Sequence, residues 1–185
     1  MSHRPLLRDC RADDLNAVLE IYAREVREGT ASFELEPPDL VELTARWQAI
    51  RRARLPYLVA EQGGRILGYA YAGAYRARPG YRYTVEDSVY VAPFAHRQGI
   101  GRALLDAVVS AAAACGMRQM VAIIGDSAHV ASIRLHEQAG FRLVGVLENV
   151  GCKFGRWLDT VIMQRELGEG AGSPPSETLR APLGR

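Results

Sequence analysis

The sequence lacks three features that mark specialised classes of protein. Its three cysteines, Cys10, Cys115 and Cys152, are scattered and have no C-x-x-C spacing, which argues against a disulfide framework or a structural zinc site. No uncharged apolar run reaches the ~18 residues of a membrane span, and the N-terminal residues contain no long apolar leader. We therefore predict a cytoplasmic protein with no metal, no export signal and no membrane partner.

An excess of one charge is also missing. Lys plus Arg total 23 and Asp plus Glu total 21, so the net charge is only +2 and gives no general reason to expect nucleic acid as a partner. The 185 residues are 48% hydrophobic, enough for one sizeable core. We predict a single domain over residues 1–167 and a disordered tail over residues 168–185, which are rich in Gly, Pro and Ser.

The hydrophobic pattern predicts a mixed α/β arrangement. Asp13 is the expected N-cap of the first helix, and Gln62-Gly63-Gly64 marks a hairpin in the first group of antiparallel strands. We predict strands at 5–10, 57–61, 65–75, 83–92, 120–124, 141–150 and 154–166, and helices following Asp13 and over 40–50, 99–115 and 130–139.

A glycine-rich turn opens the helix predicted at residue 99. Gly99 and Gly101 let an anion approach backbone N–H groups at the positive end of the helix dipole. A plain tight turn is the alternative. A Walker A loop is excluded because Gly-Lys-Ser/Thr is absent, and a dinucleotide fingerprint because residue 104 is leucine. The loop therefore favours a phosphate-bearing ligand of another kind.

Longer motifs resemble a known family. Tyr90–Pro93, His96–Leu105 and Ala139–Phe141 resemble the acetyl-CoA-binding core of the GCN5-related N-acetyltransferases (GNAT). Within that superfamily, Tyr83–Val91, Ser132–Glu137 and Lys153–Asp159 are similar to the phosphinothricin and methionine sulfoximine acetyltransferases. The resemblance implies a GNAT fold, with a mixed, mostly antiparallel sheet flanked by helices. It also implies a homodimer that transfers acetyl from acetyl-CoA to the α-amine of small amino-acid-like substrates.

The resemblance assigns a set of residues to acetyl-CoA. The turn would hold the pyrophosphate, and the end of the preceding strand would pair with the pantetheine arm. His96 stands where the family usually has Arg or Gln, and His129 where it usually has Asn. The expected acetyl-CoA contacts are Val89, Tyr90, Val91, His96, Arg97, Gln98, Gly99, Ile100, Gly101, Arg102, His129 and Ser132.

Two residues are candidates for the chemistry. Acetyl transfer needs a neutral amine, so the site must remove a proton from an ammonium group. Glu86 lies among valines on a predicted strand, where partial desolvation raises the pKa of a carboxyl. A solvent-exposed strand position is the alternative, and the resemblance favours the base. His136 stands at the family's second catalytic position, where base, acid and structural roles all remain open.

The resemblance also implies a substrate pocket. Arg76, Arg78 and Tyr81 precede the Glu86 strand, and paired guanidinium groups suit a carboxylate with a second polar head. Surface solubility is the alternative for each arginine. Phe33, Thr84 and Lys153 are the other expected substrate contacts.

Two further functions stay open: an acetyltransferase acting on proteins or peptides, and a non-catalytic acetyl-CoA-binding sensor.

Overall fold

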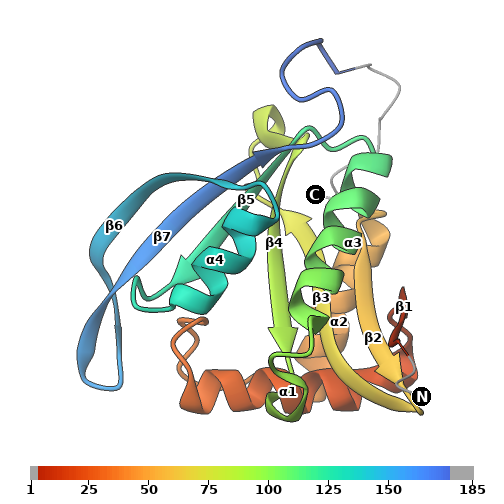
Figure 1. The fold of residues 1–185 in the computed structure, drawn as a ribbon, viewed down its shortest axis with the longest axis vertical. Helices are drawn as coiled ribbons and strands as arrows, with labels where there is room; N and C mark the ends of the chain where they lie inside the picture. The colour runs from red at the N-terminus through yellow and green to blue at the C-terminus, as the bar shows by residue number, and fades with distance from the viewer. Residues whose placement is uncertain (1–3, 176–185) are drawn as a thin grey trace.

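A computed structural model describes residues 4–175 of the protein and shows a seven-stranded sheet with four α-helices (Figure 1). The strand order is β1-β2-β3-β4-β5-β7-β6, and every neighbouring pair is antiparallel except β4 and β5. The strands are β1 Leu6–Asp9, β2 Tyr57–Gln62, β3 Arg65–Ala74, β4 Thr84–Val91, β5 Gln119–Gly125, β6 Arg142–Lys153 and β7 Arg156–Glu166. The helices are α1 Leu15–Glu28, α2 Leu40–Arg52, α3 Ile100–Ala114 and α4 Val130–Gln138.

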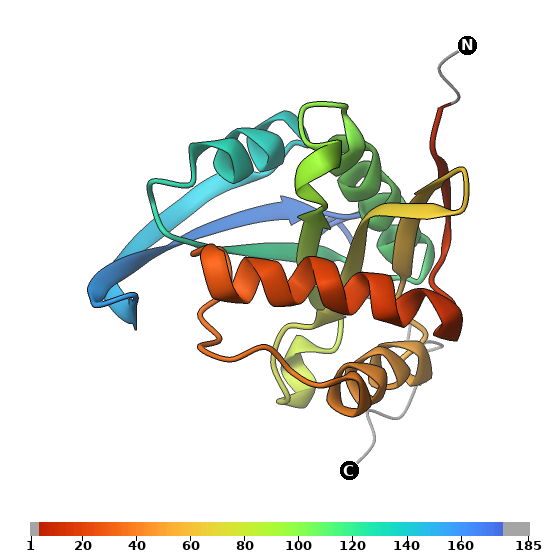
Figure 2. The ribbon, with the colours of Figure 1, turned by 90° about the horizontal axis from the view of Figure 1, so that it is seen from below.

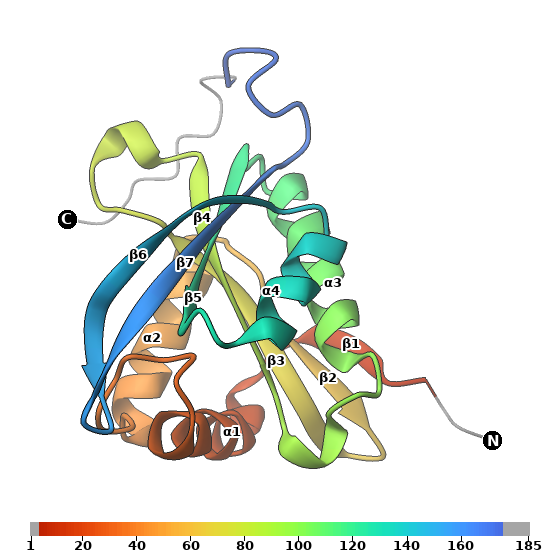
Figure 3. The same ribbon diagram turned by 60° about the vertical axis from the view of Figure 1, so that its left-hand side comes forward.

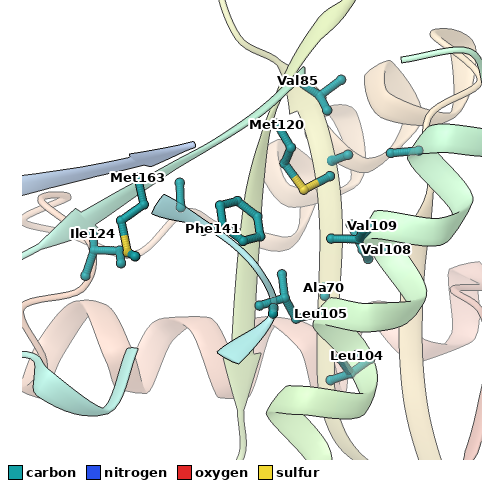
Figure 4. Packing of buried hydrophobic residues seen from close by; sticks show 14 of the residues in the cluster. Ala70, Val85, Leu104, Leu105, Val108, Val109, Met120, Ile124, Phe141 and Met163 are labelled. Atoms are coloured by element: carbon teal, nitrogen blue, oxygen red, sulfur yellow. The ribbon is translucent and has the colours of Figure 1, made fainter. Parts of the chain in front are cut away.

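The helices form one layer on each side of the sheet. Figure 2 shows α1 and α2 on one side, with α3 and α4 on the other. Two buried clusters result, because each helix covers its own part of the sheet with an apolar face. Leu104, Leu105 and Val108 of α3 pack on the larger cluster with Met120 of β5 and Phe141 (Figure 4). The smaller cluster joins α1 and α2 to β2 and β3.

The parallel pair in the centre of the sheet is short. β4 and β5 pair from Thr84 opposite Gln119 to Asp87 opposite Ala122, and the pairing ends there. Both strands continue beyond that point, to Val91 and Gly125, and they diverge as they run toward α1 (Figure 3). We call the space between Ser88–Val91 and Ile123–Gly125 the β4–β5 gap.

The structure differs from the expected N-cap of the first helix. Asp13 is not the residue that organises the start of the first helix: Asp14 accepts the Arg11 N–H at 2.7 Å and forms an ion pair with Arg8 at 2.6 Å. At the other end, residues 168–171 form turns, and Glu169 lies 3.1 Å from Arg118. Residues 176–185 lie outside the described residues, so the disordered tail stays a prediction.

Candidate active site

Two cavities meet at the β4–β5 gap and share Ala31, Ser88, Tyr90 and Ile123 among their lining residues. The first, of about 50 Å³, is also lined by Asp87, Val89, Ala122, Ile124, Ser132 and His136. The second, of about 260 Å³, is also lined by Tyr22, Ser32, Phe33, Tyr71, Glu86, Gly125 and Thr160. We call them the α4-side cavity and the α1-side cavity, after the helix that contributes to each.

Alternation along β4 decides which side chains enter which cavity. Successive strand residues point to opposite faces of a sheet. Glu86 therefore lies in the α1-side cavity, whereas Asp87 lies in the α4-side cavity. Ser88 and Tyr90 line both at the gap. The structure thus separates the two predicted catalytic residues, because His136 lines the α4-side cavity and Glu86 the other.

Glu86 is partly buried beside the rings of Tyr22 and Tyr71, which line the same cavity. Burial, and next the charge of neighbouring Asp87, raise the pKa of the Glu86 carboxyl above its ordinary value. This is the direction that the sequence predicts. A carboxylate with a raised pKa in an aromatic-lined cavity is suited to accept a proton from an ammonium group.

His136 is held on both sides of its ring. Its Nδ1 lies 2.8 Å from the Ser132 carbonyl oxygen, and its Nε2 lies 3.0 Å from Asp87 Oδ2. The edge of the ring meets Phe141 at 5.0 Å between centroids. Burial lowers the pKa of His136, but the hydrogen bond and charge of Asp87 outweigh it, so the pKa lies above the ordinary value. A ring between two acceptors favours the imidazolium.

The start of α3 has the shape of an anion site. Gly99 adopts φ 78° just before the helix, and the first N–H bonded back along the chain is that of Ala103, to the Gly99 oxygen. The N–H groups of residues 100–102 therefore have no partner within the helix. A Cβ at Gly101 would meet Leu135 and Val91 at an ordinary 3.5 Å. Packing alone does not require glycine there, whereas close approach of a phosphate does.

The free edge of β4 offers backbone groups to the gap. The Ala92 N–H donates to the Leu67 oxygen of the β3 side. The N–H and C=O groups of successive strand residues point to alternate sides of the strand. Those of Tyr90 therefore also point to β3, whereas those of Val89 and Val91 point to the gap. Val91 accepts a hydrogen bond from the His96 ring at 3.0 Å. Of the three residues expected to pair with pantetheine, Val89 and Val91 are suitably directed and Tyr90 is not.

Tyr90 instead contributes its ring to the wall of the cavities. It stacks on Tyr69 at 5.1 Å and meets Tyr22 edge-on at 5.2 Å. Phe33 also lines the α1-side cavity, where its ring lies against two glycines. A Cβ at Gly125 would lie 2.9 Å from the ring, and a Cβ at Gly151 would overlap it. Phe33 therefore lines the α1-side cavity, and its contact with substrate stays a prediction.

Several other predicted residues do not line either cavity. Arg76 stacks over Tyr75 at 5.1 Å, with Tyr81 edge-on to the same ring at 5.6 Å. Lys153, the single lysine of the sequence, is buried and donates to the Ser32 oxygen at 2.7 Å, which anchors the loop that carries Phe33. Arg78 and Thr84 likewise line neither cavity. Of the two residues predicted near the start of α4, Ser132 lines the α4-side cavity and His129 does not.

Among residues 4–175, no three His, Cys, Asp or Glu side chains are grouped as metal ligands, and the absence of a metal stays a prediction. No helix within the same residues is long and apolar enough to cross a bilayer. All three cysteines are free.

The fold, the free strand edge and the helix start together define the class of protein. The family model described as Acetyltransferase (GNAT) family matches residues 15–141, and the chain belongs to this family. It is an N-acetyltransferase with acetyl-CoA as donor, and the fold and enzyme class predicted from the sequence are confirmed.

Individual relatives are similar along most of the chain. A phosphinothricin N-acetyltransferase of Alcaligenes faecalis is 53% identical over 169 residues, which are 91% of this chain and 86% of the relative. An L-methionine sulfoximine/L-methionine sulfone acetyltransferase of Salmonella typhimurium is 42% identical over 85% of this chain and 92% of its own length. A phosphinothricin acetyltransferase of Sinorhizobium meliloti, solved in complex with AcCoA, is 46% identical with a TM-score of 0.92 and covers 95% of each chain.

Proposed function

We propose that this protein acetylates the α-amino group of small amino-acid-like substrates of the phosphinothricin or methionine sulfoximine type. The observation that carries the proposal is the position of Glu86 in the aromatic-lined α1-side cavity, which meets the α4-side cavity at the β4–β5 gap. The named activities of the relatives support the same substrate class.

Acetyl-CoA fits the α4 side of the gap. The unpaired N–H groups at the start of α3 and the glycine at 101 would hold its diphosphate, and the outward backbone groups of Val89 and Val91 would hold its pantetheine arm. When bound, acetyl-CoA would supply, as a thioester, the acetyl group that is transferred. The Val89 N–H faces the gap and would stabilise negative charge on the carbonyl oxygen.

Glu86 acts from the α1-side cavity, across the gap from the acetyl-CoA. Its carboxylate accepts a proton from the substrate ammonium, which leaves a neutral amine able to attack. The rings of Tyr22, Tyr71 and Tyr90 line this cavity and exclude water around the amine. A carboxylate faced by aromatic rings suits a cationic amine before transfer and a neutral amide less well afterwards, which favours release of the product.

A panel of amines tests the substrate class. With acetyl-CoA and wild-type protein, release of free thiol is expected with phosphinothricin, methionine sulfoximine or methionine sulfone, and at least about tenfold less kcat/KM with peptides that bear the same N-terminal residue. Faster turnover of peptides would assign the protein to the acetyltransferases of proteins. Acetyl-CoA binding without turnover of any amine would favour a sensor.

We also propose a homodimer formed through the β6–β7 surface. β6 is an edge strand of twelve residues, and seven large apolar side chains on β6, β7 and their turn are at least 42% exposed. They are Leu143, Val144, Val146, Leu147, Val150, Phe154 and Trp157. An exposed edge strand can pair with another chain, and a large exposed apolar patch marks an interaction site. A second copy of this chain would cover both at once.

Sedimentation equilibrium tests the dimer. The wild-type protein is expected at twice the mass of the chain, and Val146→Asp at the mass of one chain, because a charge on the covered face opposes association. Val41→Asp is the matched control, since Val41 is 79% exposed on α2, far along the chain from this surface. A wild-type protein that sediments as a monomer at micromolar concentration would contradict the proposal.

The cytoplasmic location and the lack of a nucleic-acid partner rest on the sequence and stay predictions.

A further inference from the structure

Asp87 forms a buried pair with His136 that the sequence does not reveal. The two residues are separated by 49 positions, and both are buried, at 6% and 4% exposure. Asp87 Oδ2 accepts from His136 Nε2 at 3.0 Å, while Asp87 Oδ1 is buried with no hydrogen-bond partner among the described residues. A buried carboxylate oxygen without a partner is costly, which indicates a role beyond joining α4 to β4.

The groups around the His136 ring favour its protonated form. Each nitrogen faces an acceptor, the Ser132 carbonyl from α4 and the Asp87 carboxylate from β4, and the third neighbour is the uncharged ring of Phe141. Glu86, next to Asp87 on β4, lines the other cavity. Asp87 is therefore the charged group that contacts the ring. A neutral ring would set a nitrogen lone pair against an acceptor, so the pair favours the imidazolium.

The pair also lies on the side of the gap to which the proposed function assigns acetyl-CoA. Asp87 and His136 line the α4-side cavity, together with Val89 at the free edge of β4. Glu86 serves the amine from the opposite face. Under the proposed function, Glu86 is thus the proton acceptor for the amine, and His136 is available as a proton donor on the side of the thiol.

We propose that Asp87 is the positioning residue that keeps His136 protonated and oriented as the proton donor to the sulfur of CoA. This inference rests on the proposed function. As the amine nitrogen bonds to the acetyl carbon, the carbon–sulfur bond breaks and its electron pair remains on sulfur. The Nδ1–H bond of the imidazolium then breaks and an S–H bond forms, while the Nε2–H stays hydrogen-bonded to Asp87 Oδ2. The substrate nitrogen, positively charged after its attack, loses a proton to water. The neutral ring regains a proton at Nδ1 from water, because the Nδ1 lone pair faces the Ser132 carbonyl oxygen and the Asp87 carboxylate stabilises the charged ring.

Asp87→Asn tests this role because it keeps the shape of the side chain and removes its charge. In the ligand-free protein, NMR titration of the His136 ring is expected to show a pKa lower by about one unit or more than in the wild type. With acetyl-CoA and the best amine, kcat at pH 8 is expected to fall about tenfold, and the high-pH limb of the kcat profile to move to lower pH. KM for acetyl-CoA is expected to change by less than about threefold.

The control is Asp13→Asn, which removes the same charge from an exposed position, and it should leave both titration and profile unchanged. If Asp87→Asn lowers only thermal stability and moves neither the His136 titration nor the pH profile, Asp87 has a structural role and the proposal is wrong. If the variant does not fold, the wild-type titration decides: a His136 pKa at or below the ordinary value of about 6.5 overturns the proposal. Failure of the proposed function is a separate result, namely wild-type protein that releases no thiol with any amine.

Discussion

Replacing Glu86 with glutamine is expected to lower kcat by about 10² to 10⁴-fold. Glutamine keeps the size of the side chain but cannot accept a proton, so the substrate amine stays an ammonium group in the α1-side cavity. Acetyl-CoA affinity, measured by calorimetry, should be unchanged because the residues suited to hold the cofactor lie on the other side of the gap. The Glu20→Gln variant, at an exposed position of α1, is the matched control.

The pH profile gives a second readout of the same residue. Burial raises the pKa of Glu86, so its carboxylate form is present above that raised pKa and is lost as the pH falls through it. The wild-type kcat/KM should therefore decline toward acid with a pKa above the ordinary 4.5 of a glutamate, and Glu86→Gln should lack this limb. A variant that binds acetyl-CoA normally and turns over at the wild-type rate would show that Glu86 is not the base.

Replacing Gly101 with alanine is expected to weaken acetyl-CoA binding on the order of 100-fold while the protein stays as stable as the wild type. The added Cβ meets Leu135 and Val91 at 3.5 Å, which is ordinary contact. Alanine also has a helix propensity better by about 1 kcal/mol. The diphosphate, however, is displaced from the N–H groups at the start of α3, and the weakening of two charge-assisted hydrogen bonds costs about 3 kcal/mol.

Calorimetric affinity for acetyl-CoA and thermal unfolding together check this expectation. Ser110→Ala, at an exposed position of the same helix, should change neither quantity appreciably. Gly101→Ala protein that binds acetyl-CoA as the wild type does would remove the start of α3 from the cofactor site. Loss of binding together with loss of stability would mean that Gly101 serves packing instead.

The sequence predicts the elements of this fold well, because apolar periodicity and glycine signals are local. The turn signal Gln62-Gly63-Gly64, for example, correctly marks the hairpin between β2 and β3. The predicted N-cap is wrong by one residue, since only the folded structure brings Arg8 to Asp14. The insertion of β7 between β5 and β6, and the early end of the β4–β5 pairing, depend on contacts between distant segments that local patterns do not encode.

The site is predicted less completely, for the same physical reason. Glu86 and the turn before α3 can be predicted from the local sequence. The separation of Glu86 from His136 cannot, because it depends on how the folded sheet divides the site into two cavities on its opposite faces. Asp87 is not among the predicted residues, although a charged residue among Val85, Val89 and Val91 on one strand face is a signal that alternation reveals. Lys153 is predicted as a substrate contact, whereas its partner is a backbone oxygen 121 positions away.

The position of Phe33 makes the size of the α1-side cavity depend on one loop residue. The ring occupies space left by the missing side chains of Gly125 and Gly151, and it belongs to a loop rather than to the sheet. Exchanging the ring for a smaller side chain enlarges the chamber next to the amine without altering the strands that hold Glu86. Selection for a new amine can therefore act on one loop position while the machinery for acyl transfer is inherited intact.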